Sequence, residues 1–474
     1  MKKNYFLAIA VAALMLAATV AQAADVSFSG QIRPRFISQG DNTDTTNQDN
    51  QFDTRIRLNA KANVNANTEV FVQMQSIATW GNAASNNDSA QANDDNASLG
   101  IHQGYVTLKN FMGQAVNAKV GRQEVVLDGH RLFGHTGWTT GAQTNHAIRL
   151  DHSAGNHTVN YVYIAAIEAG AIDTNTAANS DLHVFRAATQ GILGGSLQGY
   201  FVIADDDSAA ATFDDNNQWY TIGARQSGKL AGLDYRVEFY HQFGDGAVTA
   251  TAANFSNAYD GVNGSTAVNS SDIDRNAQMF GVRLGKTFKN SKLSPTITLW
   301  YDSLSGTDDE DASSSDMGTF NTLQDTGHKF YGFMDQFLNA TGAASGYYGL
   351  QDIAVKTKFK VSDVNTLKID FHHFETQTDL EGADSDTLRT NSADFGSVST
   401  GTMNGDLGQE LDIVWVHKYD SNTKIVGGYG HYFSTTAFSQ LNGGGGTAGS
   451  NSNSDQDWAF LMIEIGRASC RERV

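Results

Sequence analysis

The sequence predicts an all-β fold, namely a transmembrane antiparallel β-barrel of about eighteen strands. Three observations predict it. Residues 53–64 (DTRIRLNAKANV) alternate charged or polar side chains with apolar or small ones at period two, which is the side-chain spacing of a strand. Glycine is abundant, with 47 residues, whereas proline is almost absent, with 2. Similar alternating segments recur along the chain, and the connections between them are alternately short and long.

The first 23 residues are expected to be a signal peptide. Lys2 and Lys3 precede an apolar run from residue 6 to about residue 21, and the triplet AQA that ends at Ala23 has the small residues of a cleavage site. An uncleaved anchor is the alternative, but the run is short for a membrane span. Because no later segment has the ~18 to 20 continuous apolar residues of a transmembrane helix, any membrane crossing would be made by strands.

A single barrel is predicted over residues 24–464. No linker divides this region, and no fixed repeat of about 20 to 50 residues suggests a propeller or solenoid. The predicted strands are residues 26–37, 53–64, 69–80, 98–109, 116–127, 144–151, 157–168, 181–189, 194–203, 217–226, 232–243, 276–288, 295–305, 350–361, 366–375, 407–418, 423–433 and 456–464.

Residues 465–474 are interpreted as an artefact, because they resemble the translation of a sequencing-adapter oligonucleotide. The one cysteine, Cys470, lies there, so the authentic exported chain is expected to have no disulfide. A genuine basic extension is the alternative.

The long connections are rich in acidic residues, as in residues 204–217 and 306–316. An acidic rim would repel incoming anions and attract divalent ions, although solvated loops explain the same pattern. No loop has the ligand spacing of an EF-hand, so no metal site is predicted. The formal net charge of -19 disfavours binding to nucleic acid.

Arginines in the first two predicted strands indicate which face looks toward lipid. Arg33 and Arg35 alternate with Ile32 and Phe36, and the pattern recurs around Arg55. An Arg on the lipid face near the bilayer midplane costs about 2–4 kcal/mol, so the cations are expected to face the lumen. A one-residue slip would move all of them to the wrong face, and the register is therefore tightly specified.

The residues expected to line the lumen extend this pattern around the barrel. A change of phase near Gly121 predicts a bulge that turns Arg122 and Glu124 inward. The alternative role for each charged residue is an ion pair that braces the wall. The candidates are Arg33, Arg35, Arg55, Arg57, Lys61, Arg122, Glu124, Arg149, Asp151, Arg225, Arg236, Arg283, Lys356 and Lys358.

Four motifs resemble those of the alginate-export family of outer-membrane barrels. They are GQIRPRF at residues 30–36, VGRQEVVLDGHRLFG at 120–134 with a following Trp138, TFNTLQDTGHKFYGFMDQF at 319–337, and LGQELDIVW at 407–415 followed by GGYGHYF. The resemblance covers nearly the whole mature chain and implies an eighteen-stranded barrel with an arginine-lined passage for a polyanionic polysaccharide. The family loop motif comprises His328, Gly332 and Asp335.

The expected function is a channel in the Gram-negative outer membrane for diffusion or export of anionic saccharides, such as alginate-like polyuronates, or related organic anions. Expected partners are outer-membrane lipid, lipopolysaccharide and the anionic substrate, and a periplasmic export partner is left open. No cofactor is expected. The alternatives are a weakly selective general porin, a barrel enzyme acting on lipid, and a sealed structural barrel.

An enzyme is disfavoured by the sequence. Histidines such as His130 and His135, and serines such as Ser303, supply catalytic residue types, but G-x-S-x-G, H-E-x-x-H and C-x-x-C motifs are all missing from the chain.

Overall fold

The structure is a computed structural model that describes residues 25–41, 49–80, 98–167, 180–206, 217–245, 274–307, 316–338, 340–341, 345, 348–378, 405–441 and 455–466. The expected signal peptide at residues 1–23 lies outside these residues. Ile465 and Gly466 belong to the last strand, and the rest of the expected artefact, residues 467–474, also lies outside them.

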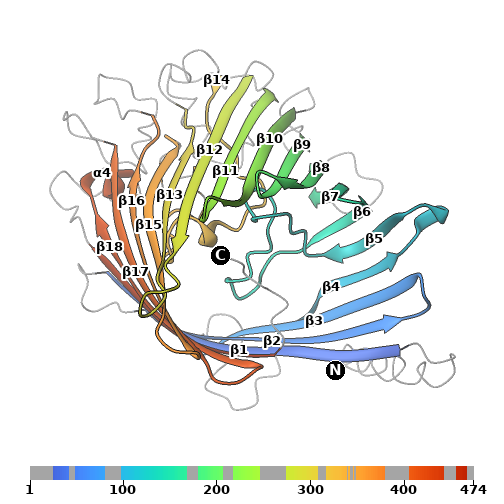
Figure 1. Cartoon of the computed structure of the whole chain (residues 1–474), viewed down its shortest axis with the longest axis horizontal. Coiled ribbons are helices and arrows are strands. Elements are labelled where there is room, and N and C mark those ends of the chain that lie inside the picture. The colour runs from blue at the N-terminus through green and yellow to red at the C-terminus, as the bar shows by residue number, and fades with distance from the viewer. Residues whose placement is uncertain are drawn as a thin grey trace.

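The chain forms one continuous wall of strands that runs from blue to red in Figure 1. All eighteen predicted strands are present, so the predicted fold class is confirmed. Helical elements among the described residues are short: η2 (Phe111–Gly113), η6 (Gly327–Lys329) and α4 (Thr436–Leu441). The strands are β1 (Asp25–Asp41), β2 (Asp49–Asn63), β3 (Thr68–Trp80), β4 (Ser98–Leu108), β5 (Val116–Gln123), β6 (Asn145–Ala154), β7 (His157–Ile167), β8 (Ser180–Ile192), β9 (Gly195–Asp206), β10 (Asn217–Leu230), β11 (Leu233–Asp245), β12 (Asp274–Thr287), β13 (Thr296–Leu304), β14 (Asp316–Met317), β15 (Leu350–Lys360), β16 (Asn365–Glu375), β17 (Asp406–Lys418), β18 (Thr423–Ser434) and β19 (Gln456–Gly466).

Closure of the wall comes from β1, which pairs antiparallel with both β2 and β19. Every other long strand pairs antiparallel with its two neighbours around the barrel. The exception is β14, a two-residue strand that the sequence did not predict and that pairs parallel with the start of β12. No edge strand of the wall is therefore left open.

The distribution of side chains is the inverse of that in a soluble protein. Phe28 and Leu58 are 63% and 52% exposed on the outer face, whereas Arg33 and Arg55 are each 4% exposed on the inner face. Arg33 lies directly opposite Arg55 in the β1–β2 pair. The predicted assignment of faces in these strands is confirmed, because an apolar outer band matches lipid and a polar interior matches water.

The connections at one end of the barrel are short, whereas two long connections at the other end supply a core inside the barrel. One is the β5–β6 loop (residues 124–144), and the other is the β13–β15 loop (residues 305–349), of which the structure describes all but 308–315, 339, 342–344 and 346–347. Phe133 of the first loop and Phe320, Phe330 and Phe337 of the second are fully buried. The described residues contain no helix that is both long enough and apolar enough to cross a membrane.

Candidate functional site

The two long loops pair with each other inside the barrel. The amide of Gly134 donates to the carbonyl of Gln324 at 2.7 Å, and the amide of Gln324 donates to the carbonyl of Leu132 at 3.0 Å. The amide of Thr326 donates to the carbonyl of His130 at 3.1 Å. The first two bonds form a single parallel bridge between Phe133 and Gln324. All three bonds join chain segments almost 200 residues apart, so the two loops form one structural unit.

Three predicted lumen-lining arginines anchor the β5–β6 loop to β1 and β2. Arg33 donates to the three carbonyl oxygens of residues 137–139 at 2.8–3.1 Å. Arg35 donates to the middle carbonyl at 2.8 Å, and Arg55 donates to the outer two at 3.0 and 3.1 Å. The three side chains lie on the inner wall, but the loop covers them. These three arginines therefore hold the loop in place, and the loop shields them from a substrate in the lumen.

An aromatic contact joins the two loops above these arginines. The rings of Trp138 and His328 stack with centroids 4.4 Å apart and planes 4° apart. His328 is held on its other side by Asp335, with 2.7 Å between Nδ1 and Oδ1. The guanidinium of Arg35 lies 4.8 Å from the centroid of the Trp138 ring. His328 and Asp335 of the family loop motif thus lie at the junction of the two loops.

Gly332, the third residue of that motif, makes room for a carboxylate of the wall. Its φ is +89°, and a Cβ atom there would lie 2.3 Å from Oε1 of Glu410. The same Oε1 accepts the amide hydrogen of Met334 at 2.9 Å, and Oδ2 of Asp412 accepts that of Phe333 at 3.2 Å. Carboxylates of β17 therefore hold the β13–β15 loop by its amides, and only glycine fits at position 332.

A buried charge network lies where the β5–β6 loop meets β11, β12 and β13. Arg131 of the loop donates to Glu238 at 3.2 Å and to Asp302 at 2.5 Å. Arg283 donates to the same two carboxylates, at 2.8 Å in each case. The hydroxyl of Tyr331 accepts a further bond from Arg131 at 2.6 Å, so both loops and the wall share this network.

Two more arginines surround Glu238 at longer range. Arg225 and Arg236 approach its carboxylate to 3.8 and 4.0 Å, with side chains 12% and 14% exposed. Both pack against Gly129, where a Cβ atom would lie 2.9 Å from Nη1 of Arg236. The arginine cluster, defined as Arg131, Arg225, Arg236 and Arg283, therefore places four cations around the two carboxylates of Glu238 and Asp302.

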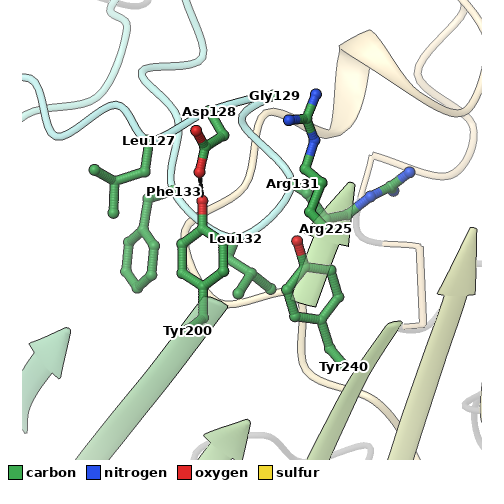
Figure 2. A pocket seen from close by; sticks show the side chains of 9 residues that line it. All are labelled: Leu127, Asp128, Gly129, Arg131, Leu132, Phe133, Tyr200, Arg225 and Tyr240. Carbon is green, nitrogen blue, oxygen red and sulfur yellow. Dashed lines mark hydrogen bonds between the residues drawn. The ribbon is translucent and has the colours of Figure 1, made fainter. Parts of the chain in front are cut away.

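A narrow hollow separates the β5–β6 loop from β9–β11 beside the arginine cluster (Figure 2). Asp128 accepts a hydrogen bond from the hydroxyl of Tyr200, as Figure 2 shows, and two bonds from Arg186 at 2.6 and 2.5 Å. The hollow is too narrow for a ligand, so these residues fix the loop. Its lining residues are Leu127, Asp128, Gly129, Arg131, Leu132, Phe133, Tyr200, Arg225 and Tyr240.

Three further predicted lumen residues lie on the wall formed by β2 to β5. Arg57 donates to Glu124 at 3.4 Å and lies 3.0 Å from Nε2 of His102, which also contacts Glu124. Lys61 pairs with Glu69 at 2.8 Å near the short-turn end. Ion pairs thus take up part of the charge of both cations.

The remaining predicted residues lie apart from the loop anchors. Arg149 pairs with Asp151, its neighbour two positions along β6, at 2.8 Å. Lys356 lies 3.8 Å from Asp370, and Lys358 is exposed one step closer to the short-turn end. The structure therefore distributes the fourteen candidates around the wall and does not gather them into one site.

The region around Gly121 differs from the expected bulge. β5 keeps an unbroken register with β4 and β6 through Gly121, whose φ is +127°. Arg122 Nη1 lies 3.3 Å from Nε2 of His146, which shares a strand face with the outward, 42% exposed Ile148. Arg122 therefore lies with the outward residues, whereas Glu124 points inward as expected.

Sequence reasoning missed Arg131 and Asp302, which are central to the charge network. Arg131 lies in a loop whose sequence has no strand periodicity, so no pattern marks its side chain as inward. Near Arg131, only His130 and His135 were considered, as possible catalytic residues. Asp302 alternates with Tyr301 and Ser303 in a predicted strand, so the period-two signal was sufficient to identify it.

His130 and Ser303, the catalytic residue types singled out in the sequence, lie on different sides of the wall, since His130 belongs to a lumenal loop and Ser303 shares a strand face with the outward Leu299. Burial lowers the pKa of His130 to about 3, so its imidazole is neutral. Ser303 lies on the opposite strand face from Asp302, whose side chain points into the lumen. The described residues include no group of three His, Cys, Asp or Glu side chains that could hold a metal ion.

Comparisons with known proteins agree with this geometry. A family model described as alginate export matches residues 24–445. The search of curated protein sequences finds no match. Among solved structures, Pseudomonas aeruginosa OpdK with vanillate aligns with a TM-score of 0.55 at 8% identity, covering 93% of this chain and 98% of that one. Acinetobacter baumannii OccAB1 aligns with a TM-score of 0.54 at 12% identity, covering 94% and 97%. Pseudomonas aeruginosa OccK8 (OprE) aligns with a TM-score of 0.54 at 11% identity, covering 93% and 98%.

Proposed function

The chain belongs to the alginate export family, and from this premise we propose that it forms an outer-membrane channel for anionic saccharides, such as alginate-like polyuronates, or related organic anions. Outer-membrane lipid surrounds its apolar outer face. We further propose that residues 1–23 direct export and are then cleaved, and that lipopolysaccharide contacts the outer leaflet end of the wall.

The observation that carries this proposal is the arginine cluster. Two carboxylates, Glu238 and Asp302, cannot neutralise four guanidinium groups that arginine keeps charged at any physiological pH. Both carboxylates are fully buried, so the excess positive charge is carried at the lumenal side of the network. A water-filled barrel with low-dielectric walls strengthens such a field, and it favours anions.

The cluster also suggests a division of roles among the arginines. Arg131 and Arg283 hold the buried carboxylates through close hydrogen bonds. The side chains of Arg225 and Arg236 are less completely buried, at 12% and 14% exposed. Their planar forks suit both oxygens of a uronate carboxylate, so these two arginines are the proposed contacts for the substrate.

Reversal potentials in planar bilayers under a KCl gradient test the proposal. The wild-type channel is expected to prefer chloride, and the double variant R225Q/R236Q is expected to lose most of that preference. The variant K109Q/K229Q removes the same charge from exposed positions near the short turns and serves as the control. A cation preference in the wild type contradicts the proposal.

Liposome swelling separates the proposed function from a weakly selective porin. Uronate oligomers are expected to enter faster than neutral oligosaccharides of equal size. Equal rates of swelling support the general porin, and the absence of swelling in folded protein supports a sealed barrel.

A further inference from the structure

The short-turn end of the barrel carries an arc of lysines that the proposed selectivity site does not use. Five exposed lysines lie in or beside the turns that join β12 to β13 and β15 to β16, and at the end of β17. This lysine arc consists of Lys289, Lys292, Lys358, Lys360 and Lys418.

Backbone hydrogen bonds show that these segments are neighbours in space. The amide of Lys360 donates to the carbonyl of Leu293 in the β12–β13 turn at 2.7 Å. The amide of Lys418 donates to the carbonyl of Val364 in the β15–β16 turn at 2.8 Å. The arc is therefore one continuous surface across five adjacent strands, and at ~4.8 Å per strand it spans roughly 19 Å.

The carboxylates of these turns offset little of the charge. Asp363 pairs with Lys360 at 2.7 Å, but the two side chains are 93% and 60% exposed, where an ion pair holds weakly. Asp420 accepts the amides of Asn422 and Thr423 at 2.7 Å each, which stabilises its own turn.

The basic surface continues from the rim into the lumen. Lys358 lies directly opposite Lys368 in the β15–β16 pair, which places two positive charges side by side. Further in, the Nζ atom of Lys356 lies 4.6 Å from the ring centroid of Trp300, and the guanidinium of Arg283 lies 3.3 Å from the same centroid. The arc thus leads to the arginine cluster.

The opposite end of the barrel has like-charge pairs of the other sign. Asp181 lies opposite Asp205 in the β8–β9 pair, and Asp245 lies opposite Asp274 in the β11–β12 pair. Like-charge pairs at both ends concentrate charge of one sign at each mouth. Together they place negative potential at the long-loop mouth and positive potential at the short-turn mouth, which is the periplasmic one in outer-membrane barrels.

We propose that the lysine arc is a capture surface that recruits a polyanionic chain, with several carboxylates spaced along its length, into the barrel from the short-turn side. This inference rests on the proposed function, because it names the side and the chain length of the anionic cargo. A monocarboxylate can neutralise only one lysine of the arc. A polyuronate oligomer can contact several lysines at once, and the long-loop mouth repels it.

Single-channel block by a uronate hexamer tests this proposal. The orientation of each reconstituted channel is determined with the S421C variant in a C470S background. A membrane-impermeant thiol reagent is added to one side and reacts only if the short-turn end faces that side. The expected rate of block by hexamer is about tenfold higher from the short-turn side than from the long-loop side at low salt. The variant K289Q/K292Q is expected to reduce only the rate from the short-turn side, by about threefold to tenfold.

Matched controls make the outcome decisive. K109Q/K229Q removes two exposed lysines from the same end but outside the arc and is expected to leave the rate unchanged. Monomeric uronate is expected to show little dependence on either variant. The proposal is overturned by symmetric block, by equal effects of the two double variants, or by equal effects on monomer and hexamer.

Two other roles of the arc give different results. If the lysines instead hold anionic lipid, K289Q/K292Q impairs insertion into phosphatidylglycerol vesicles and leaves block by the hexamer intact, which overturns the proposal. If K289Q/K292Q leaves both vesicle insertion and block by the hexamer intact, the capture proposal is also overturned, and an acidic protein partner becomes the favoured role of the lysine arc. Reversal potentials in KCl measure the anion preference that we attribute to the arginine cluster, and they do not depend on the hexamer. A failure of the proposed anion selectivity is therefore distinguishable from a failure of the capture surface.

Discussion

Replacing Gly332 by alanine is expected to detach the β13–β15 loop from the inner wall while the barrel stays folded. Gly332 has a φ of +89°, and Oε1 of Glu410 lies 2.3 Å from the position that a Cβ atom would occupy. Alanine therefore meets two obstacles at once: an unfavourable backbone conformation and a direct clash with the carboxylate.

The magnitude of the loss follows from these two obstacles. A left-handed conformation costs a residue with a Cβ atom about 1–2 kcal/mol. Relief of the clash requires the Glu410 carboxyl group to withdraw from the amide of Met334, and a buried donor left without a partner costs about 1–3 kcal/mol. Loop docking is therefore expected to weaken by about 2–5 kcal/mol, which raises the undocked population at least ~30-fold.

Hydrogen exchange of the Met334 amide in detergent micelles measures this population directly. The G332A variant is expected to exchange at least ~30-fold faster at this amide, whereas amides in β1 and β2 keep their wild-type rates. G141A is the matched control, because Gly141 lies in the other lumenal loop and a Cβ atom there would meet no atom within 4 Å.

A double-mutant cycle with E410A isolates the clash. If Glu410 is the obstacle, the combined variant G332A/E410A loses about 1–3 kcal/mol less than the sum of the single losses. Strict additivity, or unchanged exchange of Met334 in G332A, would refute the assigned contact.

Two further predictions concern the junction of the loops. R131M leaves the buried carboxylates of Glu238 and Asp302 without their loop partner, and breaking a buried pair costs about 3–5 kcal/mol. Protease is then expected to cut within residues 124–144 while the barrel remains resistant, and the same cleavage in the control R149M contradicts the prediction. Burial raises the pKa of Asp325 to about 8, against the opposing influence of Arg131. In the undocked loop the pKa of this carboxyl group is near 3.8. Between these two pH values the carboxyl group is therefore protonated in the docked loop and ionised in the undocked loop. Loop docking should therefore be strongest below about pH 4, weaken by about 1.4 kcal/mol per pH unit, and level off above about pH 8. D325N is expected to remove this slope in protease protection measured across the range, and a slope that persists in D325N counts against the role of Asp325.

The strands could be predicted from the sequence because their determinants are local. Phe28 and Arg33 lie on opposite faces of β1, and the contrast between lipid and water fixes which face is which within a few residues. The same reasoning fails for β14, since two residues carry no periodicity. It also fails at Arg122, where the backbone at Gly121 changed the expected face.

The partners of the inner residues could not be predicted in this way. Arg33 and Arg55 are correctly placed on the inner wall, but their acceptors are backbone carbonyls of residues 137–139, more than 80 positions away. Carbonyl groups are present at every residue, so the sequence does not mark the ones that a loop will present. The path of the β5–β6 loop across the lumen depends on long-range packing, and Arg131 was missed for the same reason.

The two lumenal loops are held by opposite chemistries, and this determines which charges remain for a substrate. Arginines of β1 and β2 take the carbonyls of one loop, and carboxylates of β17 take the amides of the other. Charges committed to these bonds cannot be counted as a selectivity filter, even though they line the inner wall. A count of inward arginines therefore overestimates the filter, whereas the partly exposed Arg225 and Arg236, which share Glu238 with two other arginines, retain the charge that a passing carboxylate would meet.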